Sequence, residues 1–134
     1  MRKFLIATHG TFAAGIKSSL EIIIGTTENI FLIQAYMDGN KSIRDELEEV
    51  LQSVNEDDEL IVFTDLTGGS ITNQVLQVAF QPNVYIVSGV NLPLLLDIIL
   101  SDPDLPANDV IEAGVSNAKD QIVYVNKLIN SKGE

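Results

Sequence analysis

Apolar runs alternate along this chain with longer segments whose apolar residues recur at helical spacing. The first run, residues 3–8, precedes Phe12, Ile16 and Leu20, which recur at every fourth position. Strands that alternate with helices pair in parallel, because each helix carries the chain back to the same end of the sheet. We therefore predict an α/β fold, with a mostly parallel sheet in the strand order 2-1-3-4 and helices on both faces.

The same alternation predicts the element boundaries. The predicted strands span residues 3–8, 30–36, 59–64 and 84–87, and the predicted helices span residues 12–24, 43–54, 70–80, 92–100 and 106–119. Ser70 is the expected N-cap of its helix, and a short fifth strand is expected over residues 121–125. Helix 92–100 is apolar almost all round, so it is either buried or packed on another subunit, and we favour the subunit contact. We expect residues 1–134 to form a single domain.

Composition excludes several kinds of site. The chain has no Cys and one His, which rules out thiolate chemistry and leaves too few ligands for a structural zinc ion. The net charge of −11 opposes binding to nucleic acid or to anionic membranes, and it fits docking to a basic protein. No signal peptide is evident, and the longest apolar stretch is too short to cross a bilayer. We therefore expect a soluble, cytoplasmic protein that uses no metal.

The single histidine, His9, directly follows the first predicted strand and precedes Gly10 at the start of a helix. This position lies on the open edge of the sheet beside a helix N-terminus, where backbone N–H groups and the helix dipole favour an anion. A neutral imidazole there could act as a nucleophile toward phosphorus. Taken alone, a histidine that only caps a turn or hydrogen-bonds within it explains the residue better, because lone histidines are common.

One further loop carries the groups that would complete such a site. Asp65 ends the third predicted strand, and the strand order reverses between the first and third strands. Asp65 would therefore face His9 across the crevice that opens there, and it would orient the imidazole by accepting a hydrogen bond from one ring N–H of His9. Gly68 and Gly69 allow backbone N–H groups to turn toward an anion, and Ser70 adds a hydroxyl. Each of these residues could serve only in a turn or a cap, and their coincidence opposite His9 favours a phosphoryl site.

Three segments resemble the IIA component of the mannose-type sugar phosphotransferase system, the family that includes mannose, fructose and sorbose systems. The matching segments are Thr8-His9-Gly10 with Ala13, Gly15, Ile16, Ser19 and Ile22-Ile23-Ile24-Gly25, then Thr64-Asp65-Leu66-Thr67-Gly68-Gly69-Ser70 with Asn73, and finally Ser88-Gly89-Val90-Asn91-Leu92-Pro93-Leu94-Leu95-Leu96. They lie in order and extend over nearly the whole chain, so together they are highly specific.

The resemblance implies a phosphocarrier in which His9 accepts a phosphoryl group on Nε2 from the histidine-containing phosphocarrier protein. His9 would then pass the group to the IIB component, which serves a membrane permease of IIC and IID subunits. Asp65 would hold the Nδ1–H, and Thr67, Gly68, Gly69 and Ser70 would bind the phosphoryl group. No cofactor is implied. The family is dimeric, with an antiparallel fifth strand exchanged between subunits, and the sugar is contacted by the membrane subunits alone.

One departure and two alternatives remain. Ile71 stands where many members of the family have Pro, which is favoured but not required at a helix start. The phosphotransfer subunit of dihydroxyacetone kinase is similar in fold, but such chains usually have Ser after the histidine, where this chain has Gly10. A non-catalytic regulatory module, in which phosphorylation of His9 only signals to a partner, would use the same site.

Overall fold

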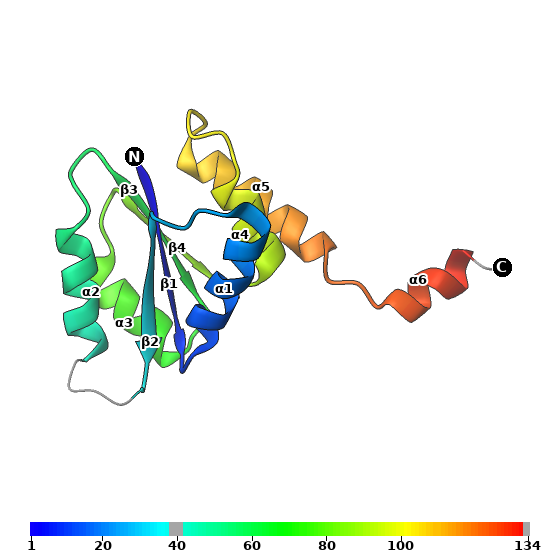
Figure 1. Ribbon diagram of the computed structural model, residues 1–134, viewed down its shortest axis with the longest axis horizontal. Helices are drawn as coiled ribbons and strands as arrows, with labels where there is room; N and C mark the ends of the chain where they lie inside the picture. The colour runs from blue at the N-terminus through cyan, green and yellow to red at the C-terminus, as the bar shows by residue number, and fades with distance from the viewer. Residues whose placement is uncertain (38–41, 133–134) are drawn as a thin grey trace. The chain divides into compact units, whose positions relative to one another are not determined.

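The structure is a computed structural model that describes residues 1–37 and 42–132. The described part contains four strands and six helices in two compact units, Met1–Leu92 and Pro93–Glu134 (Figure 1). The first unit holds the sheet, and the second unit is helical. Among the described helices, none has the length and apolar character that crossing a membrane would require.

Parallel strands form the sheet of the first unit. They are β1 (Arg2–His9), β2 (Ile30–Ala35), β3 (Glu59–Thr64) and β4 (Val84–Ser88). Their order is β2-β1-β3-β4, which confirms the predicted order. Ala7 of β1 lies opposite Ile33 of β2 and Thr64 of β3. The direction of strand addition reverses between β1 and β3, so the carboxyl ends of these two strands form the topological switch point at which such sheets bind ligands.

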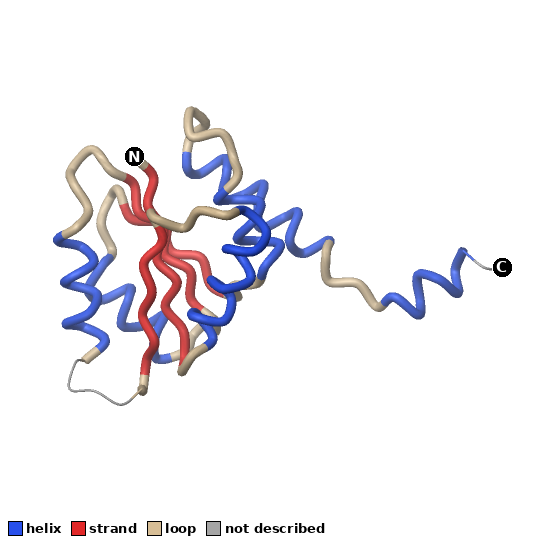
Figure 2. The backbone as a smooth tube through the Cα atoms, in the orientation of Figure 1, coloured by secondary structure: helices blue, strands red, loops and turns tan. Residues whose placement is uncertain are grey.

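Helices cover both faces of this sheet within the first unit. Helix α1 (Phe12–Ile24) packs on one face, and α2 (Ile43–Gln52) and α3 (Ser70–Ala79) pack on the other, as Figure 2 shows. Leu5 and Ala7 belong to the core formed with α2 and α3. Phe4 points to the opposite face and stacks on Phe63, with 6.4 Å between ring centroids. Burial of both faces explains why the strands are continuous apolar runs.

Hydroxyl side chains begin two of these helices. Ser42 caps α2, since its Oγ accepts a hydrogen bond of 3.1 Å from the backbone N–H of Asp45. The buried Thr8 Oγ1 accepts a hydrogen bond of 2.8 Å from the backbone N–H of Ala13, in the first turn of α1. Thr8 therefore fixes the start of α1 against the end of β1, immediately before His9.

The second unit contains α4 (Leu92–Ile99), α5 (Ala107–Asp120) and α6 (Val125–Lys132). Gly114 of α5 lies against Ile98 of α4, where an added Cβ would come within 2.6 Å of the Ile98 Cγ1. Glycine is therefore needed for this close approach of the two helices. Three apolar side chains of α4 are buried, namely Leu94, Leu95 and Ile98.

The predicted fifth strand over residues 121–125 is wrong for this chain. Residues 122–124 have no regular structure, and α6 begins at Val125. A strand needs a neighbouring edge to satisfy its backbone groups, and a sequence pattern cannot state whether one is present. The side chains of Ile122 and Tyr124 are 80% and 73% exposed, so this apolar segment is unpaired within the single chain.

Candidate functional site

His9 is the last residue of β1, at the carboxyl edge of the sheet. It lies in register with Ala35, the last residue of β2, and its side chain is 42% exposed to solvent. The next residue, Gly10, has a φ of 57° and donates its backbone N–H to the Ala35 carbonyl at 2.9 Å. This left-handed turn suits glycine and separates the end of β1 from the start of α1.

Asp65 directly follows β3 and contacts His9, as the predicted strand order requires. A single carboxylate oxygen, Oδ2, accepts two hydrogen bonds from the histidine. One is from the backbone N–H of His9 at 2.9 Å, and the other joins the ring Nδ1 at 2.8 Å. The main chain and the ring of His9 are therefore held by the same atom on the neighbouring strand.

The charge of Asp65 follows from these contacts. Burial raises the pKa of the Asp65 carboxyl, but the hydrogen bonds from the His9 backbone and ring outweigh that effect, and the pKa lies below its ordinary value. An ionised carboxylate only accepts hydrogen bonds, so the proton of a neutral His9 ring lies on Nδ1. The lone pair is then on Nε2, for which no hydrogen-bond partner occurs among the described residues.

Two threonines brace the loop between β3 and α3. The Thr72 Oγ1 donates to the carbonyl of Leu66 at 2.6 Å and lies 2.7 Å from the Thr64 Oγ1. Since the Thr72 proton is committed to Leu66, Thr64 donates in the second bond. Thr64 is fully buried at the end of β3, so these hydrogen bonds connect the loop that follows Asp65 to the interior of the sheet.

The glycines of this loop shape the N-terminus of α3. Gly68 has a φ of 74°, and Gly69 is the N-cap residue, where an added Cβ would lie 3.3 Å from the Leu66 Cβ. The prediction that Ser70 is the N-cap is therefore wrong by one residue. The backbone at the N-cap position leaves little room for a side chain, which suits Gly69, and Ser70 is the first residue of the helix. The first N–H groups of α3 thus remain available to an anion, because no side chain caps them.

The hydroxyls of this region make contacts that the sequence did not reveal. Thr67 Oγ1 is hydrogen-bonded to Ser88 Oγ at the end of β4, which ties Thr67 to the neighbouring strand. Ser70 Oγ lies 2.5 Å from the hydroxyl of Tyr36, whose ring in turn contacts His9. Tyr36 was not among the predicted site residues. Its place at the end of the second predicted strand, next to His9 in the order 2-1-3-4, is the only signal in the sequence.

The site residues described above lie in the part of the chain that is similar to known proteins. A sequence model of the PTS system fructose IIA component family matches residues 3–114, which include every predicted site residue. The chain belongs to the PTS system fructose IIA component family. The family is part of the sugar phosphotransferase system, which gives the chain a general role in phosphoryl transfer for sugar uptake.

Individual members of this IIA family are similar over most of the chain. The PTS system fructose-specific EIIA component of Bacillus subtilis (strain 168) is 25% identical over 113 residues, which cover 83% of this chain and 77% of that protein. A crystal structure from Klebsiella pneumoniae subsp. pneumoniae MGH 78578, attributed to a phosphoenolpyruvate-dependent sugar phosphotransferase system, matches with a TM-score of 0.89 and 33% identity, covering 96% of this chain and 93% of that chain. Phosphotransferase system component EIIA from Streptococcus agalactiae matches with a TM-score of 0.79 and 31% identity, covering 95% and 99% of the two chains.

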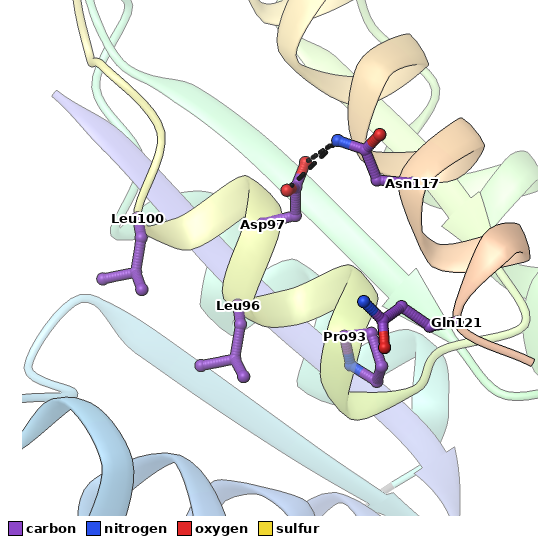
Figure 3. Close-up of a pocket in the computed structure, with 6 residues that line it drawn as sticks. All are labelled: Pro93, Leu96, Asp97, Leu100, Asn117 and Gln121. Carbon is purple, nitrogen blue, oxygen red and sulfur yellow. Dashed lines mark hydrogen bonds between the residues drawn. The ribbon is translucent and has the colours of Figure 1, made fainter.

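This IIA family member has a further hollow of about 490 Å³ in its second unit, between α4 and α5 (Figure 3). Its lining residues are Pro93, Leu96, Asp97, Leu100, Asn117 and Gln121. The amide of Asn117 donates to both carboxylate oxygens of Asp97 at 3.3 Å. The carboxylate of Asp97 makes this hollow negatively charged, so the hollow does not suit a phosphoryl group. Across the described residues, no group of three or more His, Cys, Asp or Glu side chains is placed to hold a metal ion.

Proposed function

We propose that this chain is a single IIA phosphocarrier domain in which His9 accepts a phosphoryl group from the histidine-containing phosphocarrier protein and passes it to the IIB component. The observation that carries the proposal is the double hydrogen bond from His9 to the Asp65 Oδ2. It fixes the ring, places the proton on Nδ1 and leaves Nε2 as the nucleophile. The half-exposed ring supports contact with a donor protein.

The transfer then needs no proton movement in the protein. The Nε2 lone pair of His9 attacks phosphorus while the bond between phosphorus and the donor's imidazole nitrogen breaks, and the departing nitrogen keeps that electron pair. Positive charge develops on the His9 ring as the new bond forms, and the ionised Asp65 stabilises it through the Nδ1–H. Transfer to IIB is the same step in reverse, with His9 as the leaving group.

The phosphoryl oxygens require neutral donors, because the loop from Asp65 to Ser70 contains no Lys or Arg. The uncapped N–H groups at the start of α3 and the left-handed backbone of Gly68 support this role. Ser70 contributes a hydroxyl at the first helical position. Thr67 is tied to Ser88, so we assign it a bracing contribution within the phosphoryl-binding loop.

The proposed partners follow from the same role. The phosphocarrier protein and the IIB component would dock at the His9 edge, and the IIC and IID permease subunits would receive the phosphoryl group indirectly. The net charge of −11 favours a donor with a basic surface. We place the protein in the cytoplasm as a homodimer. The fructose-specific name of the Bacillus subtilis relative describes that protein, and sugar choice lies with the membrane subunits of the system.

Intact mass spectrometry tests this function. The chain is incubated with phosphoenolpyruvate, the first enzyme of the system and the phosphocarrier protein, beside a His9→Ala variant. We expect an acid-labile gain of one phosphoryl group (about 80 Da) in the parent, none in the variant, and discharge when the cognate IIB is added. A folded parent that gains no mass from a competent phosphocarrier would overturn the proposal.

A further inference from the structure

Tyr36 adopts an unusual backbone conformation directly after β2. Its φ is 62°, and it is the one non-glycine residue with a positive φ in the described part of the chain. A bulky aromatic residue rarely adopts this left-handed conformation, so the surrounding structure must hold it there. Conformations of this kind cluster at functional sites.

The ring of Tyr36 contacts the proposed nucleophile. The ring centroids of Tyr36 and His9 are 5.4 Å apart, and the planes are tilted by 37°. The contact follows from the register, since Ala35 lies opposite His9 and its carbonyl accepts the Gly10 N–H. The left-handed turn at Tyr36 comes immediately after this hydrogen bond. Because β2 and β3 lie on either side of β1, the Tyr36 ring contacts the His9 imidazole from the β2 side, and Asp65 contacts it from the β3 side.

The hydroxyl of Tyr36 is paired with Ser70, at 2.5 Å. Two hydroxyls that share one hydrogen bond use one of their two protons in it. The other proton has no partner among the described residues, and it remains for an acceptor from outside. An anionic oxygen is the acceptor that this position favours, because Ser70 begins α3 and the helix dipole is positive there.

We propose that Tyr36 is part of the phosphoryl site: its ring positions the His9 imidazole, and its hydroxyl, paired with Ser70, supplies an O–H donor to the phosphoryl group. The inference rests on the proposed function, since it assumes that His9 carries the phosphoryl group. Loop residues 65–70 contain no cation, so each neutral donor contributes appreciably to holding a dianion.

Two substitutions separate the ring from the hydroxyl. Tyr36→Phe keeps the ring and removes the hydroxyl, and Tyr36→Leu removes both. Tyr85→Phe is the matched control, because Tyr85 lies within β4, opposite Ile61, away from the carboxyl edge of the sheet. Each variant is phosphorylated by the phosphocarrier protein, and we measure the single-turnover rate of mass gain and the ³¹P chemical shift of the phosphohistidine.

For Tyr36→Phe we expect a rate about 10- to 100-fold lower, as for one lost hydrogen bond to a charged group, and a displaced ³¹P resonance. Tyr36→Leu should be slower still, and Tyr85→Phe should match the parent in both readouts. A phosphorylated parent with an indistinguishable Tyr36→Phe would overturn the hydroxyl's role, and equal rates for Phe and Leu would overturn the ring's role. A parent that gains no phosphoryl group would overturn the proposed function and, with it, this inference.

Discussion

The two hydrogen bonds between Asp65 and His9 end on one oxygen, and this geometry makes their contributions separable. In Asp65→Asn the amide oxygen can still accept both bonds, so the ring stays oriented while the negative charge is lost. We expect the rate of His9 phosphorylation to fall roughly 100-fold, because the charge developing on the imidazole is no longer stabilised. Single-turnover mass spectrometry with the phosphocarrier protein measures this rate.

Asp65→Ala is the comparison that isolates orientation. It removes the acceptor as well as the charge, and it leaves the His9 N–H groups without this partner, so we expect a slower rate than for Asp65→Asn. Parental rates in Asp65→Asn would contradict a role for the charge. Equal rates in the two variants would show that orientation contributes nothing.

Among the elements, the loop from β3 to α3 depends on the buried Thr64–Thr72 pair. Thr72→Val keeps the shape of the side chain but removes the bond to the Leu66 carbonyl and the acceptor of the Thr64 hydroxyl. We expect the free energy of unfolding to fall by about 1–3 kcal/mol, as for buried polar groups left unpaired. Urea denaturation measures the change.

The double variant Thr64→Val with Thr72→Val serves as the control for this pair. In the double variant no threonine hydroxyl remains that could be buried without its partner. The loss in unfolding free energy should therefore be smaller than the sum of the two single losses. Strict additivity would argue against a direct contribution of the hydroxyl pair.

Asp58, at the opposite end of the sheet, should make the stability of the protein depend on pH. Asp58 is buried, and the hydrogen bond from the Asn55 backbone N–H, followed by that from Lys3, lowers the pKa of Asp58 to about 2. A lowered pKa stabilises the folded state above the ordinary value of 3.8, and this contribution is lost as pH falls from there toward 2.

Thermal unfolding between pH 2 and 7 tests this dependence on Asp58→Asn, with the exposed neighbour Asp57→Asn as its control. The parent should lose stability as pH falls below about 4, and Asp58→Asn should be less stable at neutral pH and lose less on acidification. Parallel curves for the parent and Asp58→Asn would contradict the assignment.

The sequence predicted those elements whose signals are local. The strand Glu59–Thr64 begins and ends as predicted, because both of its faces are buried and Asp65 starts the loop. The second strand ends one residue early, since Tyr36 turns into a left-handed conformation that its residue type does not predict. The run at 121–125 has the composition of a strand but pairs with none of the four described strands, and pairing is a tertiary property.

The proximity of His9 and Asp65 was predictable for a topological reason. Neighbouring parallel strands end at the same edge, so the strand order alone brings these two residues together. The contacts of Thr67 with Ser88 and of Tyr36 with Ser70 were not predictable, because each depends on side-chain rotamers across segments that are distant in sequence.

At the scale of the whole molecule, the exposed apolar segment around Ile122 bears on the proposed homodimer. In an isolated chain, a side chain that is 80% exposed can be replaced at little cost. If a second subunit covers it, Ile122→Asp should weaken dimerisation by at least about 10-fold, as for the loss of a buried isoleucine. Sedimentation equilibrium measures the dissociation constant.

Ile22→Asp is the matched control for this substitution. Ile22 is also an exposed isoleucine, but it lies on α1 in the first unit. We expect Ile22→Asp to sediment as the parent does. A parent that sediments as a monomer, or an Ile122→Asp variant with unchanged dimerisation, would contradict the proposed dimer contact.

The most direct test of the chemistry is the identity of the phosphorylated ring nitrogen. His9 is the only histidine, so ¹⁵N labelling of histidine gives NMR signals from a single ring. After incubation with phosphoenolpyruvate, the first enzyme of the system and the phosphocarrier protein, we expect phosphorus coupling at Nε2 and a proton retained on Nδ1, opposite Asp65. Phosphorylation at Nδ1 would contradict the proposed mechanism, because it would require the bond between His9 and Asp65 to break.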